Sequence, residues 1–261
     1  MSITGSPFRP EADPSSPDSS NPSDDVAAIE QDWNRRHLDA DAPRPAFRVW
    51  RYARPAIVLG VSQRSRLMHT RARAGDRLDV LVRDSGGGAV LTWPGFVSLS
   101  VALPHGHPGA ASRVHESYRW LGEIHLQALA MVGVGARLVA PEQLRATVTE
   151  RRASDVGWAC FGSLAPWEVV SGDGRKLSGF AQKRGRHGVL LVAGTLVTPP
   201  DWTLLAEALG ESPRDAAALA RQTVCAGEIA DRPIDPAAFA EQLARRVQDA
   251  LGVPDRPARD S

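Results

Sequence analysis

The most constraining stretch of this chain lies between two short apolar runs, PWEVV (Pro166 to Val170) and GVLLVAGTLV (Gly188 to Val197). Both runs are bounded by Gly or Pro and rich in β-branched residues, which predicts β-strands. The run between them, GDGRKLSGFAQKR (residues 172–184), opens with a glycine-rich turn and holds both lysines of a chain with 31 basic residues. We expect the rest of the chain to be organised around this stretch.

Lys176 is the first candidate for site chemistry. A lysine is a compact point charge on a flexible stem, and it can approach a single oxygen atom in a way that arginine cannot. The pattern therefore predicts a functional Lys176 at a turn between strands, outside the core. An ordinary surface lysine on a hairpin arm fits the same pattern equally well.

Length and composition indicate one large globular domain, with room for a small appendage. The chain has 261 residues, of which 43% are hydrophobic, and its net charge is +1, so neither nucleic acid nor an anionic membrane is an expected partner. No apolar run reaches the roughly 18 residues of a membrane helix, and no signal peptide is recognisable at the N-terminus. These features predict a cytoplasmic protein. Its two cysteines, Cys160 and Cys225, are then expected to be free thiols.

The predicted elements alternate without a strict strand–helix–strand repeat. Strand-like runs cover residues 47–52, 56–61, 78–83, 95–103 and 138–140. Helical periodicity covers a segment that begins near Asp25 and ends at Pro43 and Pro45, and then residues 63–76, 112–132, 201–210, 213–223 and 236–252. Residues 141–157 are polar and predicted to be a loop. This order predicts an α+β fold, with a mixed, mostly antiparallel sheet flanked by helices and a small helical part at the C-terminus.

The same reading divides the chain into four parts. Residues 1–24 are rich in Pro, Ser and Asp, which predicts a disordered tail. Residues 25–199 form the main domain, 200–253 a helical C-terminal subdomain, and 254–261 a second tail. Within the main domain, His105 and His107 lack a third ligand at a sensible spacing, so no metal site is predicted.

Three consecutive glycines, Gly86 to Gly88, stand between two strand-like runs. Glycine in such a place is costly in backbone entropy unless the backbone must approach a ligand closely, as in an anion-binding nest. A plain hairpin turn with a bulge remains the alternative. No Lys-Ser/Thr pair follows, so this is not a P-loop.

Several motifs together resemble the family of lipoate-protein ligases and octanoyltransferases, which includes biotin-protein ligases. They are VLVRDSGGGAV (Val80 to Val90), GRKLSGFAQKR (Gly174 to Arg184), AGTLV (Ala193 to Val197) and VLGVSQ (Val58 to Gln63). Their order and spacing agree with the family over residues 26–252. The resemblance implies the fold of the biotin and lipoate ligases, and acyl transfer to a lysine of a lipoyl carrier domain.

The resemblance also implies roles for individual residues. Lys176 would contact the carbonyl and phosphate oxygens of an acyl-adenylate, and Arg83 would hold its phosphate. Small residues would line a narrow aliphatic tunnel. The implied substrate- or adenylate-binding set is Arg83, Ser85, Gly86, Gly87, Gly88, Ala89, Gly179, Ala181, Gly194 and Thr195.

Cys160 leaves the chemistry open. ACFGSLAPWEVV (Ala159 to Val170) resembles a segment of one group of octanoyltransferases, in which the cysteine forms a thioester with octanoate taken from acyl carrier protein. A nearby positive charge such as Lys176 could activate the thiol. A Cys-Phe pair also occurs in ligases without a covalent role, and a free cysteine is often only a small buried hydrophobe.

The chain departs from the family pattern at several positions. Thr92 and Trp93 stand where the family often has His-Asp, Ala193 replaces a histidine, Val61 replaces a frequent arginine, and Asp84 replaces an arginine of many ligases. An acidic group beside a phosphate-binding arginine is unfavourable unless it binds Mg²⁺ or points away.

Our first expectation is a lipoate-protein ligase that uses ATP and Mg²⁺ to attach lipoate or octanoate, because SGGG differs from the Gly-Gly-Arg common in the cysteine-dependent transferases. Its acceptor would be a glycine cleavage H protein or an E2 component of a 2-oxoacid dehydrogenase. The alternatives are an octanoyl- or lipoyltransferase acting through Cys160 with acyl carrier protein as donor, and a non-catalytic acyl- or partner-binding homologue. Biotin ligation is a weaker possibility.

Overall fold

The computed structural model describes residues 26–41, 44–111, 113–146 and 156–252. The predicted disordered tail and the C-terminal tail lie outside these residues. In the described part the chain forms an α+β fold built on two sheets, which confirms the predicted class. No helix in these ranges is long and apolar enough to cross a bilayer.

The larger sheet has six strands in the order β1-β5-β9-β8-β7-β6, and every neighbouring pair is antiparallel. Its strands are β1 (Ala46–Arg51), β5 (Phe96–Pro104), β6 (Arg137–Leu138), β7 (Val169–Val170), β8 (Lys176–Arg184) and β9 (Gly188–Leu196). The long hairpin of β8 and β9 lies at its centre. The GRKLSGFAQKR run is therefore mostly strand.

The smaller sheet has the order β3-β2-β4, with β2 (Ala56–Leu59) parallel to β3 (Asp79–Val82) and antiparallel to β4 (Val90–Thr92). Since β2 lies between β3 and β4, the glycine run that joins these two strands is not a hairpin turn between neighbours. The 3-10 helix η1 (Val61–Arg66), helix α2 (Leu67–Ala74) and 3-10 helix η2 (Gly75–Arg77) connect β2 to β3.

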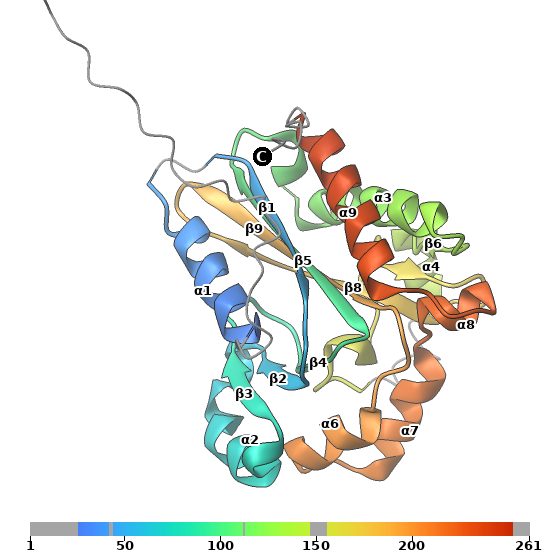
Figure 1. Ribbon diagram of the computed structural model, residues 1–261. Helices are drawn as coiled ribbons and strands as arrows, with labels where there is room; N and C mark the ends of the chain where they lie inside the picture. Colours follow the sequence, from blue (N-terminus) through green and yellow to red (C-terminus); the bar gives the residue numbers. More distant parts are fainter. Residues whose placement is uncertain (1–25, 42–43, 112, 147–155, 253–261) are drawn as a thin grey trace, which may run out of the picture.

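Helices cover both faces of the larger sheet (Figure 1). On one face, α3 (Val114–Met131) and α9 (Pro236–Leu251) pack on the apolar side of β5, which carries Val97, Leu99, Val101 and Leu103. On the other face lie α1 (Val26–Leu38), the smaller sheet, α2, α6 (Trp202–Leu209) and α7 (Pro213–Gln222). The fold thus builds two apolar cores, one on each side of the sheet.

The shorter elements complete the chain. They are η3 (Pro108–Ala110), α4 (Pro141–Ala146), η4 (Cys160–Gly162) and α8 (Ala226–Ala230). The prediction of a loop over 141–157 is wrong in its first part, because residues 141–146 form α4; Pro141 suits the first turn of a helix, where its missing N–H is not needed. Residues 147–155 of that prediction lie outside the described residues.

Strand β5 lies in the interior of the protein. Both of its faces are buried, including Ser98 and Ser100. Trp50 on β1 donates a hydrogen bond to Ser100 Oγ at 3.1 Å. The polar positions of this strand therefore face a second, partly polar interior, and the cavity described next lies there.

Candidate active site

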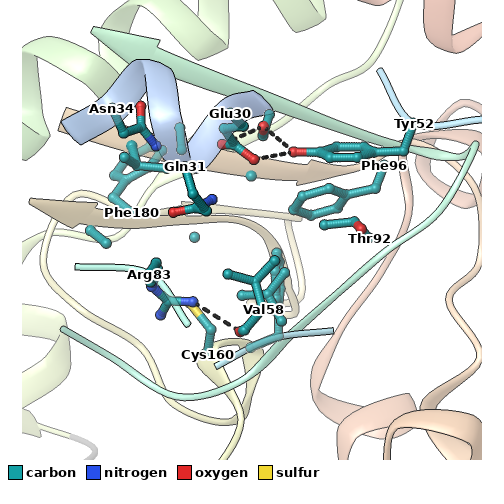
Figure 2. Close-up of a pocket in the computed structure, with 18 residues that line it drawn as sticks. Glu30, Gln31, Asn34, Tyr52, Val58, Arg83, Thr92, Phe96, Cys160 and Phe180 are labelled. Atoms are coloured by element: carbon teal, nitrogen blue, oxygen red, sulfur yellow. Dashed lines mark hydrogen bonds between the residues drawn. The ribbon is translucent and has the colours of Figure 1, made fainter. Parts of the chain in front are cut away.

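A cavity lies between α1, the smaller sheet and the central strands of the larger sheet (Figure 2). Its volume is about 50 Å³, measured as the space for the centres of water-sized molecules, so the cavity is narrow. Its lining comes from both sheets, α1, η4 and the strand-end residue Tyr52. The residues are Glu30, Gln31, Asn34, Tyr52, Val58, Arg83, Val90, Thr92, Phe96, Ser98, Cys160, Phe161, Gly179, Phe180, Ala181, Val192, Ala193 and Gly194.

The sequence-predicted site residues fall into two groups. Those that line the cavity are Arg83, Cys160, Gly179, Ala181 and Gly194. Those outside its lining are Ser85, Gly86, Gly87, Gly88, Ala89, Lys176 and Thr195. In the second group, Gly86, Gly88, Ala89 and Lys176 form hydrogen bonds with the lining residues Arg83 and Cys160.

Arg83 organises the glycine run. Its Nη2 donates to the carbonyl oxygens of Gly86 and Gly88 at 2.9 and 2.8 Å, and its Nη1 donates to the carbonyl oxygen of Val58 at 3.3 Å. The guanidinium also lines the cavity. In this structure its donors therefore serve chiefly to fold the loop back on β2.

The glycine run packs against the segment that carries the thiol. The Ala89 N–H donates to the Trp158 carbonyl at 2.7 Å, and the Cys160 N–H donates to the Ala89 carbonyl at 2.9 Å. A Cβ built on Gly88 would lie 2.5 Å from the Trp158 carbonyl oxygen. Gly88 is thus needed because two backbone segments pass each other at this point.

Lys176 is buried, and its ammonium has three partners. The residue is 3% exposed and is the first residue of β8. Its Nζ donates to the carbonyl oxygens of Cys160 at 2.8 Å and Ser163 at 2.9 Å, and it forms an ion pair with Glu168 Oε2 at 2.8 Å. The prediction of a lysine at a turn outside the core is wrong, because a paired carboxylate and two carbonyls compensate the buried charge.

Glu168 completes this arrangement. It is as buried as Lys176, and it also accepts hydrogen bonds from the Phe180 N–H at 2.9 Å and the Ala165 N–H at 2.8 Å. A Cβ on Gly179 would lie 3.0 Å from Lys176 Cε. The ion pair thus lies directly behind the cavity wall at Gly179 and fixes the turn that presents Cys160.

A second buried carboxylate, Glu30 on α1, lies on a different wall. The Tyr52 hydroxyl oxygen is 2.6 Å from Glu30 Oε2 and 2.6 Å from Ser98 Oγ, and Ser98 Oγ is 3.0 Å from Glu30 Oε1. Burial raises the pKa of Glu30, and this effect outweighs the hydrogen bonds from Tyr52 and Ser98, which lower it.

The positions that depart from the family pattern take part in local packing. Thr92 donates to the Ala56 carbonyl at 3.2 Å, and Trp93 Nε1 donates to Thr198 Oγ1 at 3.2 Å. Ala193 lines the cavity. Asp84 lies 3.3 Å from Arg35 Nε and 3.9 Å from Arg64 Nη2, so its carboxylate is directed at these arginines.

The structure also defines the surroundings of the two cysteines and of His125. Cys160 and Cys225 are free thiols, as expected. His125 is packed against Phe180 and fully buried, and burial lowers its pKa to about 4. Sequence reasoning missed Glu30, Asn34, Tyr52 and Ser98. The Ser-x-Ser pattern inside an otherwise apolar strand was the one signal that pointed to a polar interior.

Three comparisons with known proteins agree with this architecture. The chain is 29% identical over 222 residues to the octanoyltransferase LipM of Kyrpidia tusciae. The matched stretch covers 83% of this chain and 78% of that protein. The structure of a Thermoplasma acidophilum protein, assigned as a lipoate protein ligase, contains bound lipoic acid. It superposes on this chain with a TM-score of 0.63 at 16% identity, and the match covers 90% of this chain and 85% of that one. The structure of a lipoate-protein ligase A bound with ATP superposes with a TM-score of 0.61 at 18% identity. The match covers 88% of this chain and 81% of that one.

The fold is thus that of the lipoate protein ligases, built here around a cavity that contains a free thiol. The Lipoyl protein ligase A/B catalytic domain matches residues 27–248. The chain belongs to this family, which confirms the family that the sequence motifs suggested.

Proposed function

We propose that this protein is an acyltransferase that carries an octanoyl-type chain as a thioester on Cys160. The observation that carries the proposal is the position of the Cys160 thiol, which lines the cavity on the side opposite α1 (Figure 2). The similarity to an octanoyltransferase over most of both chains supports it. We therefore prefer the cysteine-dependent route to the ATP-dependent ligase that the SGGG motif favoured.

The proposed reaction has two steps. The Cys160 sulfur attacks the thioester carbonyl of an acyl carrier protein, the carbon–sulfur bond to the carrier breaks, and the released thiol takes the proton that Cys160 loses. The ε-amine of a lysine on a lipoyl carrier domain then attacks the Cys160 thioester. The amide forms, and the Cys160 thiol is restored with a proton from the amine. Lys176 is a positioning residue in this scheme, since it holds the Cys160 carbonyl.

The second candidate function is ligation through an acyl-adenylate with ATP and Mg²⁺. The structural similarity to a ligase bound with ATP is the observation that supports it. That route needs cationic donors for the phosphate. Lys176 and Arg83, the residues first expected to supply them, have their donors directed at Glu168 and at backbone carbonyls. Adenylate binding would require these contacts to be given up.

Mass spectrometry of a lipoyl domain distinguishes the two routes. One reaction contains octanoyl-acyl carrier protein without ATP, and the other contains free octanoate or lipoate with ATP and Mg²⁺. We expect acylation of the lipoyl domain in the first, together with a hydroxylamine-sensitive acyl adduct that peptide mapping places on Cys160. Acylation in the second reaction alone would establish the ligase and overturn the thioester route.

A further inference from the structure

The segment that joins β2 to β3 carries a strong positive charge on the surface of the protein. Residues 61–77, which form η1, α2 and η2, contain five arginines and one aspartate, Asp76, and so have a net charge of +4 with His69 neutral. The whole chain has a net charge of only +1, so the rest of it is negative. Figure 1 shows α2 at the outer edge of the molecule, beside α6. An acidic partner would be attracted to this edge.

Three of these arginines keep their charge uncompensated. Arg71 donates two hydrogen bonds to the Val80 carbonyl, at 3.0 and 3.2 Å, and Arg73 Nε donates to the Glu207 carbonyl at 2.7 Å. Backbone carbonyls fix the guanidinium groups in place but carry no net charge. In the described ranges of the chain, Arg71, Arg73 and Arg77 form no ion pair with a carboxylate, and all three are exposed.

The other two arginines have acidic neighbours. Arg66 pairs with Glu211, and Arg64 Nη2 lies 3.9 Å from Asp84 Oδ1. The uncompensated charge is therefore carried by α2 and η2.

An exposed methionine lies among the arginines. Met68 is 72% exposed, and Val61 at the start of η1 is 41% exposed. Arg71 follows Met68 by three residues on α2, so the two are neighbours on the helix surface. Arginine and methionine are both enriched in protein–protein interfaces, and a flexible methionine adapts to an irregular apolar surface. This combination fits a protein partner that presents carboxylates around an apolar residue.

The place of this segment relative to the thiol distinguishes between the two protein substrates of the proposed reaction. Gln63 Nε2 on η1 donates to the carbonyl of Trp158, two residues before Cys160, at 2.9 Å. None of residues 61–77 is among the described lining residues of the cavity, so the segment lies beside the thiol and not over it. An acceptor lysine has only a four-carbon stem, so its domain must lie directly over the cavity. An acyl carrier protein holds its thioester on a long pantetheine arm and can dock to one side.

We propose that the acyl donor, a carrier protein with an acidic surface, docks on this segment. The docking residues, which we call the η1–α2 surface, are Val61, Arg64, Met68, Arg71, Arg73 and Arg77. The inference rests on the proposed function, because it assigns the surface that receives the donor of that reaction. The arginines attract the carrier, Met68 packs against it, and the arm then brings the thioester to Cys160.

Single-turnover acylation of Cys160 without an acceptor isolates donor docking. Mass spectrometry of the intact protein gives the rate against donor concentration for two donors, octanoyl-acyl carrier protein and S-octanoyl-pantetheine, which has the arm but no carrier. Raising the ionic strength from about 0.01 M to about 0.1 M shortens the screening length from about 30 Å to about 10 Å. This change should raise the half-saturating concentration of the carrier donor and leave that of S-octanoyl-pantetheine unchanged.

A substitution at each of two exposed methionines assigns the effect to the surface. Met68→Glu should raise the half-saturating concentration of octanoyl-acyl carrier protein by about tenfold, because it places a carboxylate against an acidic partner. Its rate with S-octanoyl-pantetheine should equal that of the wild type, which also verifies the fold. Met131→Glu is the matched control, since Met131 ends α3 and is 59% exposed, and it should behave as the wild type with both donors. Arg77→Glu should act like Met68→Glu, by a few-fold or more.

The remaining outcomes separate the docking site from the reaction. Unchanged half-saturation with the carrier donor in both Met68→Glu and Arg77→Glu would overturn the docking site and leave the thioester route standing. Variants that slow only the transfer from acylated Cys160 to a lipoyl domain would show that the surface receives the acceptor, which contradicts our assignment. Acylation of wild-type Cys160 by neither donor would remove the proposed function itself.

Discussion

Two glutamates are buried near the cavity, and they differ in their partners. Glu168 is 2% exposed and Glu30 is 4% exposed. Glu168 pairs with Lys176 and accepts two backbone N–H groups, whereas Glu30 meets two hydroxyl groups and no cation within hydrogen-bonding distance among the described residues. Burial is nearly the same for both, so the two sites differ in what compensates the buried carboxyl: a lysine and two backbone N–H groups at Glu168, and two hydroxyl groups at Glu30.

The difference divides the cavity into two walls with different tasks. The first wall, which we call the thiol wall, carries Cys160, and the buried Lys176–Glu168 ion pair lies behind it and holds the Cys160 carbonyl. The second, the α1 wall, consists of Glu30, Gln31 and Asn34 with Tyr52 and Ser98, and it is polar. Hydrogen bonds from Tyr52 and Ser98 compensate the burial of the Glu30 carboxyl, which would be strongly unfavourable without them.

The largest expected effect is on the chemistry of the thiol wall. Cys160→Ser should lower the rate of acyl transfer by about a thousandfold or more, the scale of loss when a nucleophile is removed. The rate of lipoyl-domain acylation from octanoyl-acyl carrier protein measures it. Cys225→Ser is the matched control, because this second thiol is buried outside the cavity lining. Equal activity of the Cys160 and Cys225 variants would remove the thioester mechanism.

The next effect is on stability and tests the ion pair. Glu168→Gln leaves the Lys176 ammonium buried without its counter-ion, and it should lower the free energy of unfolding by roughly 3–5 kcal/mol. Urea unfolding followed by circular dichroism gives the value. The double variant Glu168→Leu/Lys176→Met, which removes both charges, should be less destabilised than Glu168→Gln. A double variant that is as unstable as the single one would mean that shape, not charge, holds this wall.

A third prediction concerns a substitution that moves the thiol wall through steric overlap and changes no charge. Gly88→Ala places a methyl group against the backbone of Trp158 and Ala159, and we expect a loss of about 1–3 kcal/mol, as for other overpacked sites, with a slower transfer reaction. Gly86→Ala is the control, because a Cβ there meets no atom within 4 Å, and its stability should change by less than about 0.5 kcal/mol. Equal behaviour of the two variants would show that the glycine run does not position Cys160.

The smallest effect is expected on the α1 wall. Glu30→Gln keeps the size of the side chain and a carbonyl oxygen that can accept from a hydroxyl group, and it breaks no ion pair, so it should cost less than about 1 kcal/mol. Thermal or urea unfolding of this variant beside Glu168→Gln makes the comparison directly. A loss as large as that of Glu168→Gln would contradict the expected difference between the two walls.

The pH dependence of the same pair of proteins sharpens this test. The folded-state pKa of Glu30 is raised above its ordinary value of 4.5 by burial. The folded protein therefore retains a proton that the unfolded chain releases, and stability from Glu30 falls as pH rises from 4.5 through the folded-state pKa. The wild type should lose stability relative to Glu30→Gln over this window, by up to about 1.4 kcal/mol per pH unit. His125 titrates in both proteins, so the difference between them cancels its contribution.

Much of the fold could be predicted because its signals are local. The helices over 112–132 and 236–252, and the strands at 95–103 and 188–197, show clear periodicity and closely match α3, α9, β5 and β9. The short elements were harder. β7 covers only Val169–Val170 of the predicted PWEVV strand, and α4 stands where a loop was predicted, because two to six residues carry too little pattern to separate strand, helix and turn.

The amino-acid sequence by itself determined the family, the α+β class, and the identities of Lys176, Arg83, Cys160 and the glycine run as residues near one site. These conclusions rest on motifs that are contiguous along the chain. Only the tertiary structure decided that Lys176 is a buried partner of Glu168, that Arg83 holds the glycine run, and that α1 brings Glu30 and Asn34 into the same cavity. Charge state and hydrogen bonding depend on neighbours that are distant in sequence, such as Tyr52 and Ser98 for Glu30, and no local pattern specifies them.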